Sequence, residues 1–194
     1  MGIFAKLSHR IGDNLVRSNV VKEEDAEIYI YGINQILVSV LNVSSALIIG
    51  WIFGVLLEIA VFMTAYIPLR TFAGGYHAKT PIRCYIFSVI LLIIVSSCMK
   101  YIFIAEWVYY AILATAALVV LILAPVEDKN KPLDETEHKV YKRRTMLIAA
   151  SELAPALLLK LIMFDALFIA IIYSFVVLSL MLVAGKMKNR SFNL

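Results

Sequence analysis

Residues 33–69 read INQILVSVLNVSSALIIGWIFGVLLEIAVFMTAYIPL, an apolar run in which Glu58 is the only charged residue. A transmembrane helix needs about 20 apolar residues, so one helix over this whole run would greatly overshoot the bilayer. Two helices joined by a tight turn between Gly50 and Glu58 fit the membrane instead. The run therefore predicts a helical membrane protein. The turn within the run decides whether the protein has five or six membrane spans.

The composition agrees with a membrane protein. The chain has 194 residues, of which 62% are hydrophobic and 16% are charged, whereas a soluble domain is about half apolar and about a quarter charged. The formal net charge of +4 gives no basic face on a soluble scaffold, so we expect no nucleic-acid partner. Residues 1–32 are polar and charged, without the apolar core of a cleavable signal peptide.

Further apolar stretches follow the first run and are separated by polar loops, with residues 126–145 as a charged loop. These stretches are 84–99, 102–124, 146–163 and 166–184. Six spans within 33–184 place all but Lys100 and Lys160 of the 18 lysines and arginines on one side, which the positive-inside rule assigns to the cytoplasm. Five spans would scatter the basic residues across both faces. We therefore expect an all-α protein of the bacterial cell membrane with six transmembrane helices, both termini cytoplasmic, and a cytoplasmic tail at 185–194.

The first 17 residues have an amphipathic pattern. Their apolar side chains recur at helical spacing, and the charged residues fall largely on other faces: the apolar set is Ile3, Phe4, Leu7, Ile11 and Leu15. This pattern predicts a helix lying in the membrane interface, within an amphipathic segment 1–32 of a single domain covering 1–194. The alternative is a helix packed on the rest of the protein.

Residues 70–84, RTFAGGYHAKTPIRC, interrupt the apolar runs with a chemically rich loop. Thr80 is a favourable N-cap and Pro81 is favoured at the first helical position, so a helix is predicted to begin here. Cys84 then lies in or just after the first turn. The helix N-terminus and the neighbouring Arg83 would both stabilise a thiolate at Cys84.

His77 precedes this helix by a short loop. On one unbroken helix His77 and Cys84 would be about 10 Å apart, whereas a loop with the flexible pair Gly74-Gly75 lets the imidazole fold back onto the sulfur and lets a peptide approach closely. A base beside a thiol is an arrangement for covalent catalysis. Backbone N–H groups of residues 81–84, helped by Arg70, would stabilise the oxyanion.

Each of these residues also has a structural interpretation. A cysteine at a membrane edge is usually an inert small hydrophobe, as we expect for Cys98, and a histidine in a basic loop is usually just solvated. His9 and His138 are too far away in sequence to complete a metal site, so no metal or cofactor is expected. Spacing alone leaves the catalytic and the structural interpretations open.

The combination of Arg70, the sequence GGYHA and a cysteine seven residues after the histidine resembles the accessory gene regulator protein B (AgrB) family. The resemblance covers essentially the whole chain, including APVEDKNKPL at 124–133. It implies a membrane cysteine endopeptidase of bacterial quorum sensing with His77 and Cys84 as the catalytic pair. Arg70 and Gly75 also match positions of the family pattern. Together with Gly74 and Arg83 of the same loop they are the expected supporting or substrate-binding residues.

The resemblance also implies the substrate and the reaction. Members of the family remove the C-terminal part of an AgrD-type propeptide, and the thioester left on the enzyme would be displaced by an internal cysteine of the propeptide to close a thiolactone ring. A homodimer is expected by analogy with the family. Two alternatives remain: a small peptide exporter or transporter without proteolytic activity, and a non-catalytic sensor or scaffold.

Other charged and polar residues are weaker candidates. Some basic residues would attract an acidic propeptide tail, although positive-inside topology already explains them; these are Lys129, Lys131, Lys142, Arg143 and Arg144. Intramembrane carboxylates are functional candidates by default, and Glu58 and Glu106 can also simply mark span ends. The candidates for a third group that orients His77 are Asn34, Gln35 and Glu152.

Overall fold

The computed structural model describes residues 3–76, 78, 80–127 and 133–190, and it divides into two units, 1–45 and 46–194. The described residues form helices, turns and loops, with a single isolated bridge between Gly74 and Val126 and no strand. The prediction of an all-α chain is confirmed for this part of the sequence.

The first unit contains α1 (Ile3–Arg17), the short 3-10 helix η1 (Glu23–Asp25) and the first part of α2 (Ala26–Phe53). Within this unit α1 folds back along α2, since a Cβ added at Gly12 would lie 2.3 Å from the Ile30 side chain. The predicted helix at the N-terminus is confirmed. Its position in a membrane interface stays a prediction.

The apolar run 33–69 is divided between α2 and α3 (Leu56–Ala73). Gly54 has a φ of 70°, a left-handed conformation that glycine adopts without penalty. The turn is closed by the Val55 N–H, which donates to the Gly50 carbonyl at 2.8 Å. The predicted break between Gly50 and Glu58 is therefore confirmed, and a glycine in the left-handed region forms it.

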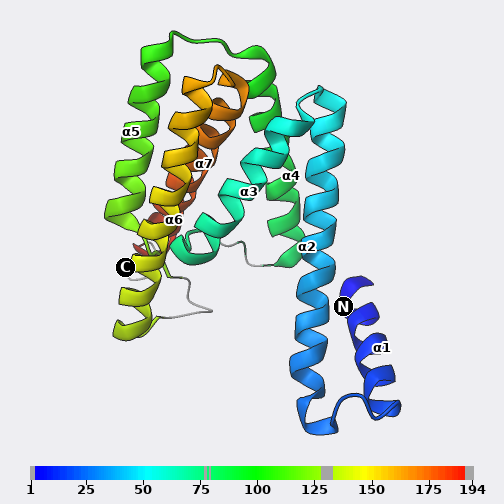
Figure 1. Ribbon diagram of the computed structural model, residues 1–194. Coiled ribbons are helices and arrows are strands. Elements are labelled where there is room, and N and C mark those ends of the chain that lie inside the picture. The colour runs from blue at the N-terminus through cyan, green and yellow to red at the C-terminus, as the bar shows by residue number, and fades with distance from the viewer. Residues whose placement is uncertain (1–2, 77, 79, 128–132, 191–194) are drawn as a thin grey trace. The chain divides into compact units, whose positions relative to one another are not determined.

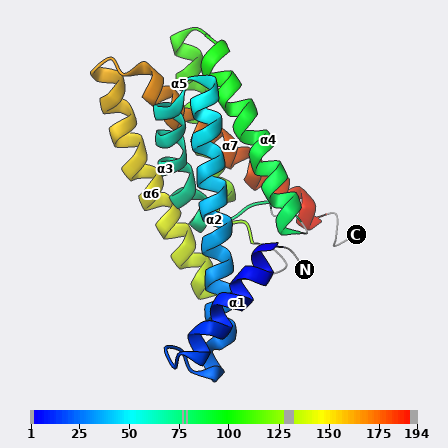
Figure 2. The ribbon, with the colours of Figure 1, turned by 90° about the vertical axis from the view of Figure 1, so that its right-hand side faces the viewer.

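The second unit continues with α4 (Pro81–Tyr101), α5 (Glu106–Leu123), α6 (Glu135–Leu161) and α7 (Asp165–Arg190). The helices of this unit run alternately up and down (Figure 1). The central helix is α7, which packs against α3 and α5 and also contacts α6 and α4. Residues on opposite sides of α7 are buried, with Phe168 and Phe175 on one side and Ala170 and Val177 on the other. Figure 2 shows α7 crossing the bundle from the end of α6 toward the start of α4.

Five helical segments of the described chain are long and apolar enough to cross a membrane: Glu23–Phe53, Leu56–Ala73, Ile82–Tyr101, Glu106–Leu123 and Asp165–Arg190. The helix α6 is not among them, because its first half is highly charged and its second half contains Glu152 and Lys160. Six spans and the orientation of the termini therefore stay predictions.

The prediction of a charged loop over 126–145 is wrong in its second half. The helix α6 already begins at Glu135, and a capping box starts it: the Glu137 N–H donates to the Asp134 carboxylate at 2.7 Å, and the Asp134 N–H donates to the Glu137 carboxylate at 3.2 Å. This reciprocal pair satisfies two N–H groups that a helix start otherwise leaves open. The helix therefore begins well before the apolar residues that predicted it. At the other end of the chain α7 continues to Arg190, beyond the predicted span end at 184.

Candidate active site

Cys84 lies at the start of α4, as the sequence predicts. Thr80 is the N-cap, its hydroxyl accepts a hydrogen bond from the Arg83 N–H at 3.3 Å, and Pro81 stands at the beginning of the helix. The Cys84 N–H donates to the Thr80 carbonyl at 3.0 Å. Cys84 itself is half-buried and carries a free thiol. The thiol is therefore on the first turn of α4, close to the N-terminal end of the helix.

His77 lies outside the described residues, so its distance from Cys84 stays a prediction. Its neighbour Tyr76 is described, and the Tyr76 ring packs against the Phe87 ring of α4 with centroids 5.8 Å apart. Phe87 follows Cys84 by three positions, so the two side chains share one face of the helix. The chain is thus held against the Cys84 face of α4 one residue before His77.

The backbone of residues 73–76, which we call the glycine segment, is fixed on two sides. On one side it pairs with Val126, whose N–H donates to the Ala73 carbonyl at 2.9 Å and whose carbonyl accepts from the Gly75 N–H at 3.0 Å. On the other side the Tyr76 N–H donates to the Met181 carbonyl of α7 at 2.9 Å. The glycine segment is therefore clamped between residue 126 and α7, immediately before His77.

The two glycines make this clamp possible. Gly74 and Gly75 have φ values of 71° and 114°, and a Cβ at Gly74 would lie 2.1 Å from the Val126 carbonyl oxygen. A Cβ at Gly75 would lie 2.7 Å from Arg70 Nη1 and 2.9 Å from the Met181 carbonyl oxygen. The space that both glycines keep free is thus filled by the protein itself. The close approach of a peptide substrate that the sequence suggested at these glycines stays a prediction.

A third glycine, Gly185 of α7, completes the contact. A Cβ at Gly185 would lie 2.8 Å from the Gly75 carbonyl carbon and 2.8 Å from the Tyr76 nitrogen. One turn earlier on α7 is Met181, which accepts the Tyr76 hydrogen bond. This part of α7 is therefore the surface on which the glycine segment lies.

Arg70 joins the last turn of α3 to the glycine segment. Its Nη2 donates to the Tyr76 carbonyl, and its buried Nη1 has no hydrogen-bond partner among the described residues. The Tyr66 hydroxyl, one turn earlier on α3, interacts with the Arg70 guanidinium and lies within electrostatic range of Cys84. Arg70, Tyr66 and Cys84 are therefore gathered at one end of the bundle.

Basic side chains cover the aromatic residues of this region. The Arg144 guanidinium of α6 lies 5.2 Å from the Phe72 ring centroid, and the Lys188 ammonium of α7 lies 5.4 Å from the Tyr76 ring centroid. Both distances are within the range of a cation–π interaction. Of the basic residues that the sequence suggested for a propeptide tail, Lys129 and Lys131 lie outside the described residues.

The other predicted site residues are only partly brought together. Arg83 is exposed beside Cys84. Glu152 lies well inside α6, about 25 Å along the helix from Glu135, and its Oε2 is buried with no hydrogen-bond partner among the described residues. Asn34 and Gln35 belong to the first unit, and their relation to the site stays a prediction.

Sequence reasoning missed three positions that hold the glycine segment: Val126, Met181 and Gly185. Val126 belongs to the stretch APVEDKNKPL that carried part of the resemblance, but nothing in its composition indicated a backbone pairing. Gly185 offered a signal, because it is a glycine at the end of the last apolar run. The Met181 contact uses only a backbone carbonyl, which every residue carries, so the sequence does not indicate it.

The fold and the free thiol at a helix start define a class, the all-helical membrane proteins with a cysteine at one end of the bundle. Within that class the chain belongs to the AgrB family, because the family model described as Accessory gene regulator B matches residues 6–184. The resemblance carried by residues 70–84 is thereby confirmed.

Several relatives support this assignment. An AgrB-like protein of Listeria monocytogenes serotype 4a is 27% identical over 145 residues, which are 73% of this chain and 71% of the relative. AgrB-like protein 2 of Clostridium perfringens strain 13 is 29% identical over 123 residues, 60% of this chain and 57% of the relative. No solved structure matches the chain.

Proposed function

We propose that this chain is a membrane cysteine endopeptidase that cleaves an AgrD-like propeptide, with Cys84 as the nucleophile and His77 as the general base. Membership of the AgrB family supports an accessory gene regulator role. The geometry around Cys84 supports the specific chemistry. The protein would work in the bacterial cell membrane, where its long apolar helices fit.

One observation carries the proposal: the backbone leading to His77 is clamped beside the helix start that bears Cys84. Tyr76 packs on Phe87, one turn after Cys84, and its N–H is held by the Met181 carbonyl. His77 is the next residue along the chain. A general base needs to be held within hydrogen-bond reach of the proton it accepts, and a fixed backbone at Tyr76 limits how far the imidazole can move from α4.

The first half of the reaction forms an acyl-enzyme. His77 removes the thiol proton of Cys84, and the thiolate attacks the carbonyl carbon of the scissile peptide bond, forming a carbon–sulfur bond. The tetrahedral intermediate collapses, the peptide C–N bond breaks, and His77 returns the proton to the leaving amine. The C-terminal part of the propeptide departs, and its N-terminal part stays on Cys84 as a thioester.

The oxyanion donors that the sequence suggested are reduced to two in this proposal. Pro81 has no N–H, and the N–H groups of Arg83 and Cys84 are already bound to Thr80. Of the backbone donors expected between 81 and 84, the Ile82 N–H is the one left. The buried Nη1 of Arg70, which lacks a partner among the described residues, is the second donor in this proposal.

The second half of the reaction releases the product. An internal thiol of the propeptide attacks the thioester carbonyl, a new thioester closes the ring, and the Cys84 sulfur leaves as a thiol after taking up a proton. Water attacking the same carbonyl would give a linear peptide instead. Holding the substrate thiol next to the thioester raises its effective concentration and favours the cyclic product.

The proposal is tested with purified protein in liposomes and an AgrD-like propeptide, with mass spectrometry of the products. Cys84→Ala and His77→Ala are each expected to abolish cleavage, because each removes a group that bonds to, or exchanges a proton with, the reacting atoms. Cys98→Ala is the matched control, since Cys98 is the other cysteine of α4, and it is expected to cleave normally. Normal processing by Cys84→Ala would contradict the proposal.

Analytical ultracentrifugation of the purified protein tests the homodimer that the family analogy suggests.

A further inference from the structure

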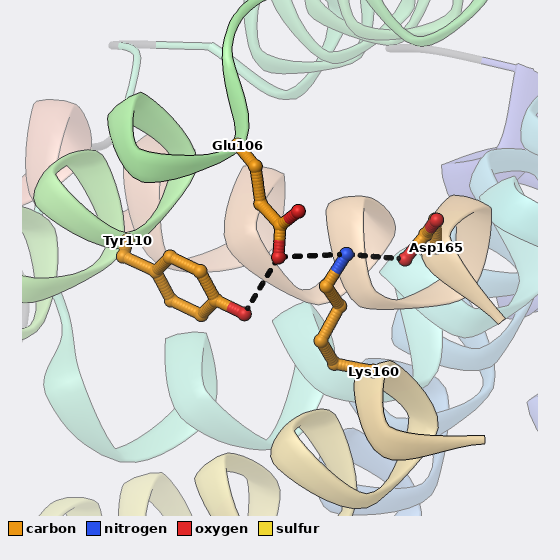
Figure 3. Close-up of polar contacts among 4 residues, drawn as sticks. All are labelled: Glu106, Tyr110, Lys160 and Asp165. Atoms are coloured by element: carbon orange, nitrogen blue, oxygen red, sulfur yellow. Dashed lines mark hydrogen bonds and ion pairs between the residues drawn. The ribbon is translucent and has the colours of Figure 1, made fainter. Parts of the chain in front are cut away.

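A second polar centre lies at the opposite end of the bundle from Cys84. The Lys160 ammonium, in the last turn of α6, pairs with Glu106 Oε1 at 3.0 Å and with Asp165 Oδ1 at 2.7 Å. Glu106 begins α5 and Asp165 begins α7. The Tyr110 hydroxyl donates to the same Glu106 oxygen at 3.2 Å (Figure 3). These ion pairs join three helix ends with the charges that helix dipoles favour.

The ion pairs form part of the wall of a cavity of about 450 Å³, a volume within the usual range of ligand sites. Its apolar wall includes Met99, Phe168 and Ile169, and its polar wall adds a third carboxylate, Glu58 of α3. Met99 is near the end of α4, the helix that carries Cys84 near its start. The cavity therefore lies about 20 Å from Cys84 along that helix.

The ion pairs between helix ends account for the placement of Glu106, Lys160 and Asp165. Glu58 takes no part in these ion pairs. Among the described residues Glu58 has no ion pair or hydrogen bond, although it lies in the cavity wall and is half-buried. One lysine faces three carboxylates, so the wall carries an excess of negative charge. A wall with this excess of negative charge attracts cations.

We infer that this cavity binds an amphipathic organic cation, namely the free amino terminus of an apolar peptide segment. The ammonium pairs with Glu58 and with the outer oxygens of Glu106 and Asp165, while the apolar side chain lies against Phe168 and Ile169. An anion is excluded by the carboxylates, and the cavity volume suits one or two residues rather than a folded partner. This inference is independent of the chemistry at Cys84.

The test uses the full-length protein in phosphatidylcholine nanodiscs and two dipeptide probes, phenylalanyl-leucinamide with a free amino terminus and its N-acetyl counterpart. Binding is measured by isothermal titration calorimetry. The free amine is expected to bind saturably, and the acetylated probe at least about tenfold more weakly, because it lacks the charge-assisted contact. Equal binding of the two probes would overturn the inference.

Variants locate the site. Glu58→Gln is expected to weaken binding of the free amine at least about tenfold, whereas Glu135→Gln, at the opposite end of the bundle, leaves it unchanged. Should Glu58→Gln fail to fold, Ile169→Trp fills the cavity instead and is expected to abolish binding. Unchanged binding in either folded variant would overturn the assignment. Competition by phosphatidylethanolamine added to the nanodiscs would overturn it too, because the cavity would then hold a lipid amine.

Discussion

Gly185 of α7 lies directly against Gly75 of the glycine segment, where a Cβ at position 185 would be 2.8 Å from the Gly75 carbonyl carbon. A helix far along the chain from the glycine segment thus contacts the backbone immediately before His77. The Tyr76 N–H bond to Met181 fixes the same backbone to the preceding turn of α7. The helix α7, which contributes no side chain to the proposed catalysis, therefore holds the backbone one residue before the proposed base.

Gly185→Ala is expected to slow cleavage at least about tenfold, because the added methyl group displaces the glycine segment and with it His77. Overpacking of this kind costs about 1–3 kcal/mol of stability. The measurement is the rate at which liposome-reconstituted protein releases the C-terminal fragment. Gly32→Ala is the control, since a Cβ there meets nothing within 4 Å. Wild-type cleavage by Gly185→Ala would show that the α7 contact does not position His77.

Gly74→Ala is expected to destabilise the protein more than Gly54→Ala. Both glycines have a positive φ, 71° and 70°, which an alanine adopts only with strain, and the ψ of −144° at Gly74 lies in a region that essentially only glycine adopts. Only Gly74 also meets a backbone oxygen, at 2.1 Å, whereas a Cβ at Gly54 meets nothing closer than 3.8 Å. Thermal unfolding should show the larger loss for Gly74→Ala. Equal losses would mean that the pairing with Val126 is not maintained.

Arg70→Lys tests the guanidinium while it keeps the charge. A lysine offers one compact ammonium, which cannot bond the Tyr76 carbonyl and stabilise the oxyanion in the geometry of a planar fork. We expect cleavage to fall at least about tenfold with propeptide binding nearly unchanged, since the lost contact acts mainly in the transition state. Arg83→Lys, at the exposed cation beside Cys84, should behave like wild type. A loss confined to substrate affinity would count against the proposed role of Arg70.

Thr80→Ala removes the cap of α4. Loss of an N-cap costs about 1 kcal/mol, and fraying of the first turn weakens the helix field at Cys84. In a Cys98→Ala background the iodoacetamide alkylation rate at pH 7 is expected to fall about two- to fivefold. Thr80→Ser keeps the hydroxyl and should retain the wild-type rate. An unchanged alkylation rate in Thr80→Ala would show that the helix start does not activate the thiol.

Local signals in the sequence predicted two decisive positions. Gly50 to Glu58 had to contain a turn, because one helix cannot accommodate the apolar run, and Gly54 provides it. Thr80 and Pro81 mark the start of α4 by cap chemistry that acts over a few residues. The start of α6 was missed because hydropathy reports where a chain enters the membrane, whereas the capping box of Asp134 and Glu137 determines where the helix begins.

The remaining features depend on contacts between distant parts of the chain. The pairing of Gly75 with Val126 uses backbone groups, which every residue carries. The cluster of Glu106, Lys160 and Asp165 forms because the start of α5, the end of α6 and the start of α7 lie close together. Glu106 and Lys160 were noted in the sequence as residues near the outer side, but their spacing in the chain carries no information about pairing.

The proposed reaction depends on a transient bond between the Cys84 sulfur and the propeptide. The most direct measurement is intact-protein and peptide mass spectrometry after mixing the reconstituted protein with a propeptide whose internal cysteine is replaced by alanine, since that substrate cannot release the thioester by closing a ring. We expect an adduct with the mass of the N-terminal propeptide fragment, located on the peptide that contains Cys84. Cleavage of this substrate by Cys84→Ala, with no adduct on any cysteine, would contradict it.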